Sequence, residues 1–429
     1  MKFDRREILA GMAASPAMAK AATAQMPQSG AGKAPDDERY WSSVAALYDV
    51  THDVIQLENG NWGMMAKPVL AAYQQHVERV NRETSYYARR SMGPELMAAR
   101  ARVAAALGVG ADEIVFTRNA TEALKGLIGG YNKLKAGDSI LYADLDYDSM
   151  QSCMRSVAQM RGVKAQRIAL PEPATHQGLI DAYAAAFDAD PKIRMVLLTH
   201  LSHRTGLVIP VREIVALARS RGIDAIVDSA HSWGQLDFTL PQIDADFVGF
   251  NLHKWWGAPL GAGVMYIRKS RLDAIDHDLA NDPHEEGRGE RVDARAHTGT
   301  VDFASLLTVP QAIDFQEAIG APARAARLRY LRDRWVKAVR SLDGIDVLTP
   351  DDPRLHGSIT SFRIRGLTTP EDNIRVTKSL LEQHGIFTVH RTGVEKGACV
   401  RATPALFNSP EQVDRLAKAL TELVPQMRR

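Results

Sequence analysis

The 429-residue sequence has little of what marks several large classes of protein. Its two cysteines, Cys153 and Cys399, allow at most one disulfide and exclude a disulfide scaffold. The 53 Lys and Arg against 51 Asp and Glu leave a net charge of +2, which is not the basic excess of a nucleic-acid-binding protein. With 45% hydrophobic and 24% charged residues, the composition excludes a disordered chain and a polytopic membrane protein. We therefore expect a large soluble globular protein of two or three domains.

The first 24 residues have the pattern of an export signal. Arg5 and Arg6 precede a mildly apolar run over 8–19, and residues 22–24 (ATA) form a small-residue cleavage pattern. The run is too short and too rich in Ala and Gly to cross a bilayer as a helix. Paired arginines are typical of bacterial twin-arginine export, which carries folded proteins. The sequence predicts export by that machinery to the periplasm and a mature form without a membrane anchor; the alternative is an N-terminus that contains Arg-Arg by chance.

Strand and helix patterns alternate over much of the chain. Apolar, β-branched runs separated by helices of 10–15 residues predict a mostly parallel sheet covered on both faces. The predicted strands are 113–117, 139–143, 164–170, 194–200, 223–228, 246–250 and 263–267. Because the 12 residues between Phe250 and Gly263 are too few for a helical crossover, we expect the last strand to be antiparallel.

A second, smaller α/β unit follows a long amphipathic helix over 322–341. It contains predicted strands at 359–364 and 398–403 and helices at 370–384 and 409–424. The expected organisation has five parts: a signal (1–24), a flexible leader (25–38), an N-terminal segment beside the substrate (39–65), a large ligand-binding domain (66–315) and a small C-terminal domain (316–429).

Polar side chains follow five of the predicted strands, at the edge where an open parallel sheet binds ligands. Ala120 and Thr121 open a helix, whose N-terminal N–H groups can bind a phosphate or simply be capped by Asn119 or Thr121. Asp228 ends an apolar strand, which is unfavourable unless a cation or strong donor meets it. Lys254 lies between a histidine and two tryptophans, where desolvation would make it a nucleophilic amine.

Together with Tyr147 after another strand, these groups are what pyridoxal phosphate requires. Lys254 would bind the aldehyde, Asp228 the pyridinium nitrogen, Tyr147 the ring face and the helix N-terminus the phosphate. Displaced by substrate, Lys254 would be placed to move the α-proton as a general acid and base.

The chain resembles the class V aminotransferase family of fold-type I pyridoxal-phosphate enzymes. The segments that carry the resemblance are FTRNATEAL (116–124), HLSHRTGLVIPV (200–211), IVDSAHSWGQL (226–236), DFVGFNLHKWWGAPLGAG (246–263), HTGTVDF (297–303) and VRATPALFNSPEQVDRL (400–416). Within the family it is most similar to isopenicillin N epimerase-like proteins. A twin-arginine signal on such an enzyme also resembles the exported enzyme that modifies the siderophore pyoverdine in the periplasm.

The resemblance implies a role for each matching residue. Lys254 would be the catalytic, cofactor-bearing lysine, and the other implied cofactor ligands are Ala120, Thr121, Tyr147, Asp228, His231, Asn251, His253 and Thr300. Thr300, in the same segment as Thr298, would come from the neighbouring subunit of a homodimer. Arg401 would bind the substrate α-carboxylate through a bidentate pair, and the other implied substrate contacts are His203, Asn61 and Trp62.

The resemblance implies an exported enzyme acting through an external aldimine on a small amino-acid-like substrate, or on a secreted peptide or siderophore such as pyoverdine. Transamination, epimerisation or racemisation, and oxidative or decarboxylative variants stay open, because all share that intermediate. Cys399 lies two residues before Arg401 in a strand-like run, which favours a structural thiol over the nucleophile of a cysteine desulfurase. Arg204 would serve a second substrate carboxylate or pair with an acid.

Two readings from other classes compete with this one. A metal-dependent hydrolase would use His200, His203, His231 and His253 with Asp228, although no HExxH motif is present. A periplasmic binding or scaffold protein would keep the fold without the chemistry, which the presence of both Lys254 and Asp228 disfavours.

Overall fold

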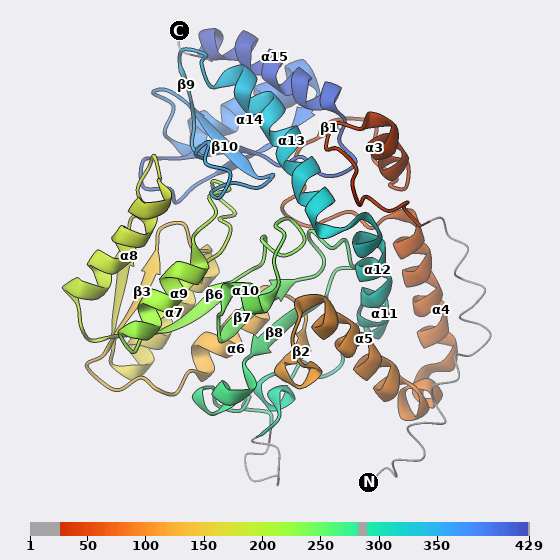
Figure 1. The fold of residues 1–429 in the computed structure, drawn as a ribbon, viewed down its shortest axis with the longest axis vertical. Helices are drawn as coiled ribbons and strands as arrows, with labels where there is room; N and C mark the ends of the chain where they lie inside the picture. The colour runs from red at the N-terminus through yellow and green to blue at the C-terminus, as the bar shows by residue number, and fades with distance from the viewer. Residues whose placement is uncertain (1–25, 282–289, 428–429) are drawn as a thin grey trace.

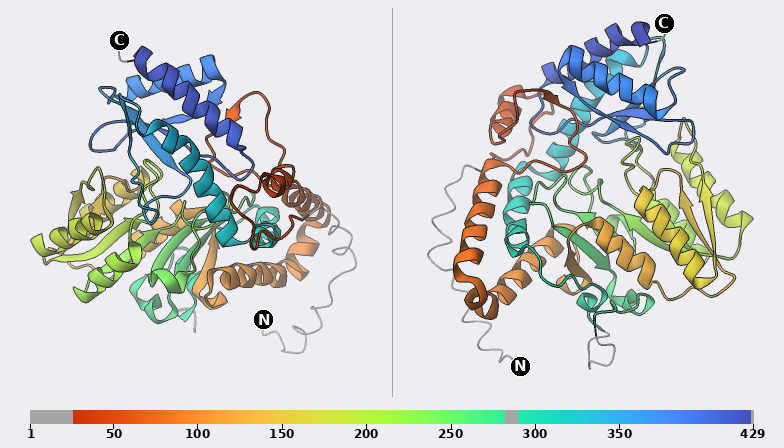
Figure 2. Two further views of the ribbon diagram at one scale, coloured as in Figure 1. Left: turned by 45° about the horizontal axis from the view of Figure 1, so that its top comes forward. Right: turned by 180° about the vertical axis from the view of Figure 1, so that it is seen from behind.

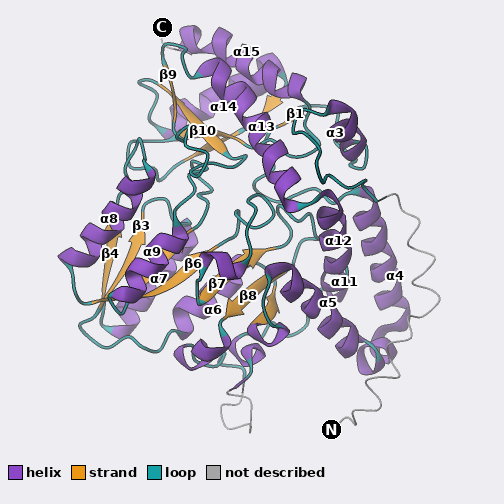
Figure 3. Cartoon of the chain, in the orientation of Figure 1, coloured by secondary structure: helices purple, strands orange, loops and turns teal. Residues whose placement is uncertain are grey.

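A computed structural model describes residues 26–281 and 290–427 (Figure 1). The predicted export signal, 1–24, lies outside the described residues. The large domain is built on a sheet with helices on both faces, and a smaller domain sits over one edge of it (Figures 2 and 3). The long helix α13 (Ala321–Val339) leads from one domain to the other.

The central sheet has seven strands, and all but one of them are parallel. β8 pairs antiparallel with both of its neighbours, which confirms the sequence expectation. In spatial order the strands are β2 (Ile114–Thr117), β8 (Gly263–Ile267), β7 (Phe247–Asn251), β6 (Asp224–Asp228), β5 (Ile193–Thr199), β3 (Ser139–Ala143) and β4 (Lys164–Ile168).

Helices cover both faces of this sheet because its central strands are apolar on both sides. One face packs against a cluster that includes Leu127 and Met154, and the other against a cluster that includes Leu179 and Ile214. The helices of the large domain are α4 (Lys67–Arg90), α5 (Met92–Leu107), α6 (Ala120–Gly130), α7 (Asp148–Arg161), α8 (His176–Ala189), α9 (Val211–Ser220), α10 (Leu240–Ile243), α11 (Phe303–Leu307) and α12 (Val309–Ile319), with 3-10 turns at Ala111–Glu113, Lys269–Ala274 and Val292–Arg295.

The small domain contains a four-stranded antiparallel sheet in the order β12 (Val389–Arg391), β13 (Cys399–Ala402), β10 (Thr360–Ile364) and β9 (Ile345–Val347). It packs with α13, α14 (Pro370–His384) and α15 (Pro410–Met427) around a core that includes Trp335, Phe362 and Leu420. This confirms the smaller C-terminal α/β unit. The domain boundary expected at 315–316 falls inside α12.

The N-terminal segment is attached to both domains. Its helix α3 (Glu38–Ala45) is followed by β1 (Ile55–Gln56), which pairs parallel with β11 (Ile386–Phe387) of the small domain. The expected flexible leader follows the surface of the protein instead of standing free, because the Gly30 N–H donates to the Ile319 carbonyl at 3.1 Å. A Cβ on Gly30 would lie 2.3 Å from that carbonyl oxygen. Composition alone does not distinguish a flexible glycine from one that permits close packing.

No helix in the described part of the chain is both long and apolar enough to cross a membrane.

Candidate active site

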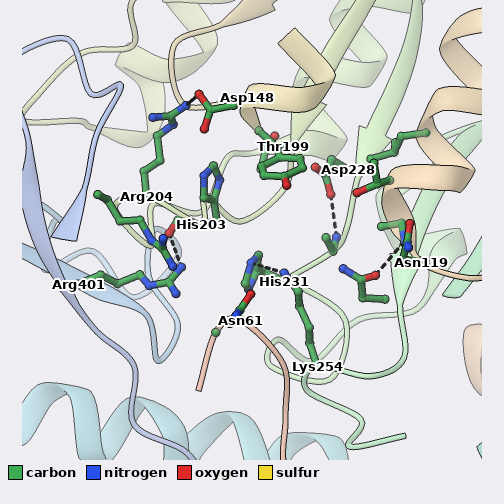
Figure 4. Close-up of a pocket in the computed structure, with 18 of the residues that line it drawn as sticks. Asn61, Asn119, Asp148, Thr199, His203, Arg204, Asp228, His231, Lys254 and Arg401 are labelled. Carbon is green, nitrogen blue, oxygen red and sulfur yellow. Dashed lines mark hydrogen bonds and ion pairs between the residues drawn. The ribbon is translucent and has the colours of Figure 1, made fainter. Parts of the chain in front are cut away.

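A cavity of about 470 Å³ lies at the carboxyl ends of the central strands, between the sheet and the small domain (Figure 4). It gathers loops that are far apart in the sequence. The residues that line it are Gly60, Asn61, Asn119, Ala120, Thr121, Leu124, Tyr147, Asp148, Thr199, His203, Arg204, Asp228, Ala230, His231, Asn251, His253, Lys254, His390, Arg391, Thr392 and Arg401. Of the predicted site residues, all except Trp62 and Thr300 line this cavity.

The phosphate end of the cavity is the N-terminus of α6. Asn119 caps the helix by accepting a hydrogen bond from the Glu122 N–H at 2.8 Å, so the capping interpretation is correct for this residue. The Ala120 N–H donates to Oδ1 of Asn251 at 2.8 Å, which ties the helix start to the end of β7. These contacts place Ala120, Thr121 and Asn251 together at a helix terminus that favours an anion.

Glycines let this helix start lie directly on the sheet. A Cβ on Gly263 would lie 2.5 Å from Cα of Asn119, and one on Gly249 would lie 2.7 Å from Cγ of Leu124. Both approaches are closer than a side chain allows, so the position of the α6 N-terminus depends on the absence of a side chain in β7 and β8.

Asp228 ends β6 as a buried carboxylate, 4% exposed. Its Oδ1 accepts a hydrogen bond from the Ala230 N–H at 2.9 Å, and it forms no ion pair with any described residue. Burial raises the pKa of Asp228, and the nearby Lys254 partly opposes this shift. A carboxylate in this state lacks a cationic partner, and a ligand with a protonated ring nitrogen would supply one.

Lys254 and His231 form the centre of the site. Nζ of Lys254 lies 2.8 Å from Nε2 of His231. Burial, followed by the positive charge of Arg401, lowers the pKa of Lys254 to about 7. Burial also lowers the pKa of His231 well below its usual value, so the imidazole is neutral.

A hydrogen bond from Trp255 indicates which nitrogen of His231 carries the proton. The Trp255 indole N–H donates to Nδ1 of His231 at 3.4 Å, and an indole nitrogen can only donate. Nδ1 is then unprotonated, and the neutral imidazole carries its proton on Nε2, facing Lys254. That contact requires the lone pair of an uncharged amine, which agrees with the lowered pKa of Lys254. The site therefore holds a lysine that is prepared to act as a nucleophile or base.

Three further predicted residues, Tyr147, His203 and His253, lie near this pair. The ring of Tyr147 is 38% exposed and meets His203 edge-on, with ring centroids 5.3 Å apart. His203 in turn stacks toward His231 at 6.5 Å between centroids. Nδ1 of His253 donates to the Ala262 carbonyl, 3.2 Å away, and burial lowers the pKa of His253 to about 4.

The opposite end of the cavity contains Arg401, whose side chain is 1% exposed. Its Nη1 donates to the His203 carbonyl at 2.6 Å, and Nη2 pairs with Oε1 of Glu58. Glu58 also lies 3.5 Å from Nη2 of Arg391. Sequence reasoning missed Glu58 and Arg391. The signal for Glu58 was present, because it is a charged residue at the end of an apolar run, as Asp228 is.

The N-terminal segment forms one wall of the cavity through two glycines. A Cβ on Gly60 would lie 2.8 Å from Nη2 of Arg401, and one on Gly63 would lie 1.8 Å from the Lys254 carbonyl oxygen. The Gly63 N–H donates to the His253 carbonyl at 2.8 Å. Asn61 faces the cavity between these glycines, whereas Trp62 is 56% exposed and does not line it.

Thr298 and Thr300 lie outside the cavity of their own chain. Thr300 is exposed, so its assignment to the site of a neighbouring subunit stays a prediction.

The histidines named for a metal site do not form one. Among residues 26–281 and 290–427, no three His, Cys, Asp or Glu side chains are grouped to hold a metal ion. His200 packs against Phe238 with ring centroids 4.9 Å apart and does not line the cavity. The geometry therefore gives no support to the hydrolase reading.

Neither cysteine lines the cavity. Cys399 is fully buried in β13, where burial raises the pKa of its thiol to about 11. Burial also raises the pKa of Cys153 on α7. This agrees with the prediction that Cys399 is a structural residue.

Comparison with known proteins gives consistent matches over most of the chain. The family model described as aminotransferase class-V matches residues 64–416. Isopenicillin N epimerase of Streptomyces clavuligerus is 29% identical over 398 residues, which cover 89% of this chain and 98% of that protein. A probable cysteine desulfurase of Methanothermobacter thermautotrophicus is 27% identical over 376 residues, covering 83% of this chain and 91% of the relative.

Solved structures show the same fold. The apo structure of a cysteine desulfurase from Thermococcus onnurineus has a TM-score of 0.75 at 23% identity, covering 89% of this chain and 98% of that one. The cysteine desulfurase CsdA from Escherichia coli has a TM-score of 0.75 at 22% identity, covering 90% and 98%.

Proposed function

The chain belongs to the class V aminotransferase family of pyridoxal-phosphate enzymes, and we propose that it acts on the amino group of an amino-acid-like substrate at the carbon beside a carboxylate. The observation that carries the proposal is the cavity that places the Lys254 amine 2.8 Å from His231, with Arg401 at the opposite end. A buried guanidinium is suited to bind the substrate carboxylate, and a nucleophilic amine is the group needed to bear the aldehyde cofactor that would take up the substrate amino group.

The residues of the cavity fit the cofactor. Asp228 is a buried carboxylate without an ion pair among the described residues, which suits a pyridinium N–H. Ala120, Thr121, Asn251 and His253 would hold the phosphate at the α6 N-terminus. When bound, pyridoxal phosphate supplies an electron sink for the bond that breaks at the substrate α-carbon.

The chain's own groups then have distinct tasks. Arg401 binds and orients the substrate carboxylate, and its position is fixed by Glu58 and the His203 carbonyl. Lys254, with a pKa of about 7, takes a proton from the α-carbon as the free amine and returns one as the ammonium. The N-terminal segment packs directly on both residues, with Gly60 against the Arg401 guanidinium and Gly63 against the Lys254 carbonyl.

Oxidative and decarboxylative variants stay open, and transamination and epimerisation both require removal of the α-proton by Lys254. In transamination a proton would be added at an atom other than the α-carbon, whereas in epimerisation a proton would be added to the opposite face of the α-carbon. Epimerisation is favoured by the relatives, since two isopenicillin N epimerases are 29% and 27% identical, each over 89% of this chain. A desulfurase reaction is disfavoured because neither cysteine reaches the cavity.

The proposal includes the place of action. The paired Arg5 and Arg6 and the short apolar run after them support twin-arginine export to the periplasm, and an enzyme that binds its cofactor before export must cross folded. A periplasmic enzyme would act on a secreted peptide or siderophore, such as pyoverdine, or on an exported amino acid. A homodimer is part of the proposal, with Thr300 completing the site of the partner.

One experiment distinguishes the reactions. Holoenzyme is incubated with single enantiomers of amino acids in D₂O, and the products are analysed by chiral chromatography and mass spectrometry. An epimerase gives the opposite enantiomer carrying deuterium at the α-carbon, and an aminotransferase gives a 2-oxo acid. If no amino acid or amino-terminal peptide exchanges its α-proton or changes the visible spectrum, the proposed function is wrong.

A further inference from the structure

The substrate end of the cavity has more buried positive charge than buried negative charge. Three guanidinium groups line it: Arg204, whose side chain is 2% exposed, Arg401 at 1% and Arg391 at 29%. The buried carboxylate that faces them is Glu58, at 6% exposed. A buried guanidinium without a counter-charge is unfavourable, so this end of the cavity is built to receive anions.

Arg391 has free hydrogen-bonding capacity. Its guanidinium donates no hydrogen bond to any described residue, and its ion pair with Glu58 is long, at 3.5 Å. Its Nε is buried and without a partner. Burial, followed by the charge of Arg401, lowers the pKa of Arg391 to about 10, so it remains a cation at neutral pH.

Arg204 is held by a partner that a ligand can replace. Its Nη2 lies 2.5 Å from Oδ1 of Asp148, a carboxylate whose side chain is 69% exposed and which also lines the cavity (Figure 4). Nη1 of Arg204 donates to the Thr392 carbonyl, next to Arg391 in the chain. A Cβ on Gly393 would lie 1.7 Å from Nη1, so the glycine permits this approach. Arg204 lies near enough to Arg391 for its charge to lower the pKa of Arg391, and Arg391 also shares Glu58 with Arg401.

Even with a substrate carboxylate at Arg401, the charged side chains at this end of the cavity leave one cation without a buried counter-charge. Three buried or half-buried cations face one buried carboxylate, and the substrate carboxylate expected at Arg401 accounts for one more negative charge. One cation then remains, and its balance rests on the solvent-exposed Asp148. An exposed carboxylate is screened by water and binds a buried cation less strongly than an anion enclosed in the same cavity.

We propose that the substrate carries a second acidic group, and that Arg391 and Arg204 bind it while Arg401 binds the carboxylate beside the reacting amine. This inference rests on the proposed function and narrows it to amino acids, or amino-terminal residues of peptides, with an acidic side chain. Asp148 forms an ion pair with Arg204 in the absence of substrate, and the second acidic group of the substrate replaces it.

The test uses ligands that cannot react. Glutarate has two carboxylates and no amino group, and glutaramate is its near-isostere with one carboxylate replaced by an amide. Binding of each to the holoenzyme is measured by titration calorimetry, with glutarate expected to bind at least about tenfold more tightly, because two charge-assisted hydrogen bonds are lost in the amide. Equal affinities within about twofold would overturn the inference.

Variants assign the effect to residues. Arg391→Gln should weaken glutarate by about tenfold and leave glutaramate within about threefold. Asp148→Asn, at an exposed position, should strengthen glutarate several-fold because it removes the competing carboxylate. Arg334→Gln, which breaks an exposed pair with Asp414 on the small domain, is the matched control and should change neither ligand. If Arg391→Gln lowers the affinity for glutarate and glutaramate equally, Arg391 does not bind the second acidic group and the inference is wrong.

The outcome is separable from that of the proposed function. Neutral amino acids that exchange their α-proton as readily as glutamate and aspartate would overturn the inference and leave the proposed function intact. A strong preference for glutarate in a protein that reacts with no amine would overturn the proposed function and the substrate assignment with it.

Discussion

The two ends of the cavity are built in different ways. At the cofactor end, Asn251 accepts a hydrogen bond from the Ala120 N–H and Asn119 accepts one from the Glu122 N–H, both at 2.8 Å, and glycines in β7 and β8 bring the helix start onto the sheet. At the substrate end, arginines from separate segments share one buried carboxylate, Glu58, which comes from the N-terminal segment. At the cofactor end the α6 N-terminus is held in place by hydrogen bonds, whereas at the substrate end three arginines face one buried carboxylate. The comparison indicates that cofactor binding is fixed by the sheet, whereas substrate choice is set where the domains meet.

The largest expected effect comes from Asp228→Asn at the cofactor end. The amide keeps the size of the side chain but cannot balance a ring cation, and loss of one member of a buried ion pair costs about 3–5 kcal/mol. We expect turnover to fall by about a thousandfold while the protein still folds and binds pyridoxal phosphate, measured by steady-state kinetics and by circular dichroism. Near-normal turnover in the variant would show that Asp228 has no role in the cofactor's electronics.

Arg401→Gln changes the substrate end of the cavity, and it should affect substrate binding without affecting cofactor binding. Loss of a bidentate charge-assisted contact should lower kcat/KM by about a hundredfold, because such hydrogen bonds contribute about 1.5–3 kcal/mol each. The affinity for pyridoxal phosphate, measured by fluorescence titration, should stay within about threefold. A variant that loses cofactor affinity as strongly as catalytic efficiency would contradict the division of the cavity into two ends.

The sequence predicted the cofactor end better than the substrate end for a physical reason. Asp228, Asn251 and Lys254 directly follow strands, and the carboxyl ends of parallel strands must share an edge. The seven strands and the reversed β8 were predictable from period and spacing in the same way.

Glu58 and Arg391 were not predicted, because their meeting depends on how the N-terminal segment pairs with the small domain. β1 joins β11, and Glu58 bridges to Thr403, more than 300 positions along the chain. Nothing in the local pattern of either segment encodes that pairing. Trp62 was placed at the site because residues 57–65 resemble the substrate-side segment of the family, but in the structure Trp62 lies in a bend, is 56% exposed and does not line the cavity.

The cradle can be tested through its glycines. Gly263→Ala puts a Cβ 2.5 Å from Cα of Asn119, so we expect a loss of about 1–3 kcal/mol in stability and weaker cofactor binding. Gly129→Ala is the control. Gly129 lies near the other end of α6, no heavy atom lies within 4 Å of the new Cβ, and the change should be neutral or stabilising by up to about 1 kcal/mol. Urea unfolding and cofactor titration measure both. Equal behaviour of the two variants would show that the close approach is not needed.

The smallest effect is a shift in pH dependence that links the two ends. Because the pKa of Lys254 is about 7, the fraction of uncharged amine is one half near that pH, and the rate at which the apoenzyme combines with pyridoxal phosphate should have its midpoint there and level off at higher pH. Arg401 helps to lower this pKa, since two nearby positive charges disfavour each other. In Arg401→Gln the midpoint should therefore move to higher pH, and in the exposed variant Arg334→Gln it should not move. A midpoint that is the same in all three proteins would show that the two ends are electrostatically independent.

The central claim is that Lys254 is the residue that binds the cofactor, and one measurement tests it most directly. The protein loaded with pyridoxal phosphate is reduced with borohydride, digested and mapped by mass spectrometry, with Lys254→Ala and Lys269→Ala treated in parallel; Lys269 is an exposed lysine paired with Asp112. The account predicts a yellow protein, a single stoichiometric pyridoxyl adduct on Lys254, the same adduct in Lys269→Ala and none in Lys254→Ala. A colourless protein that takes up no cofactor, or an adduct on another lysine, would contradict it.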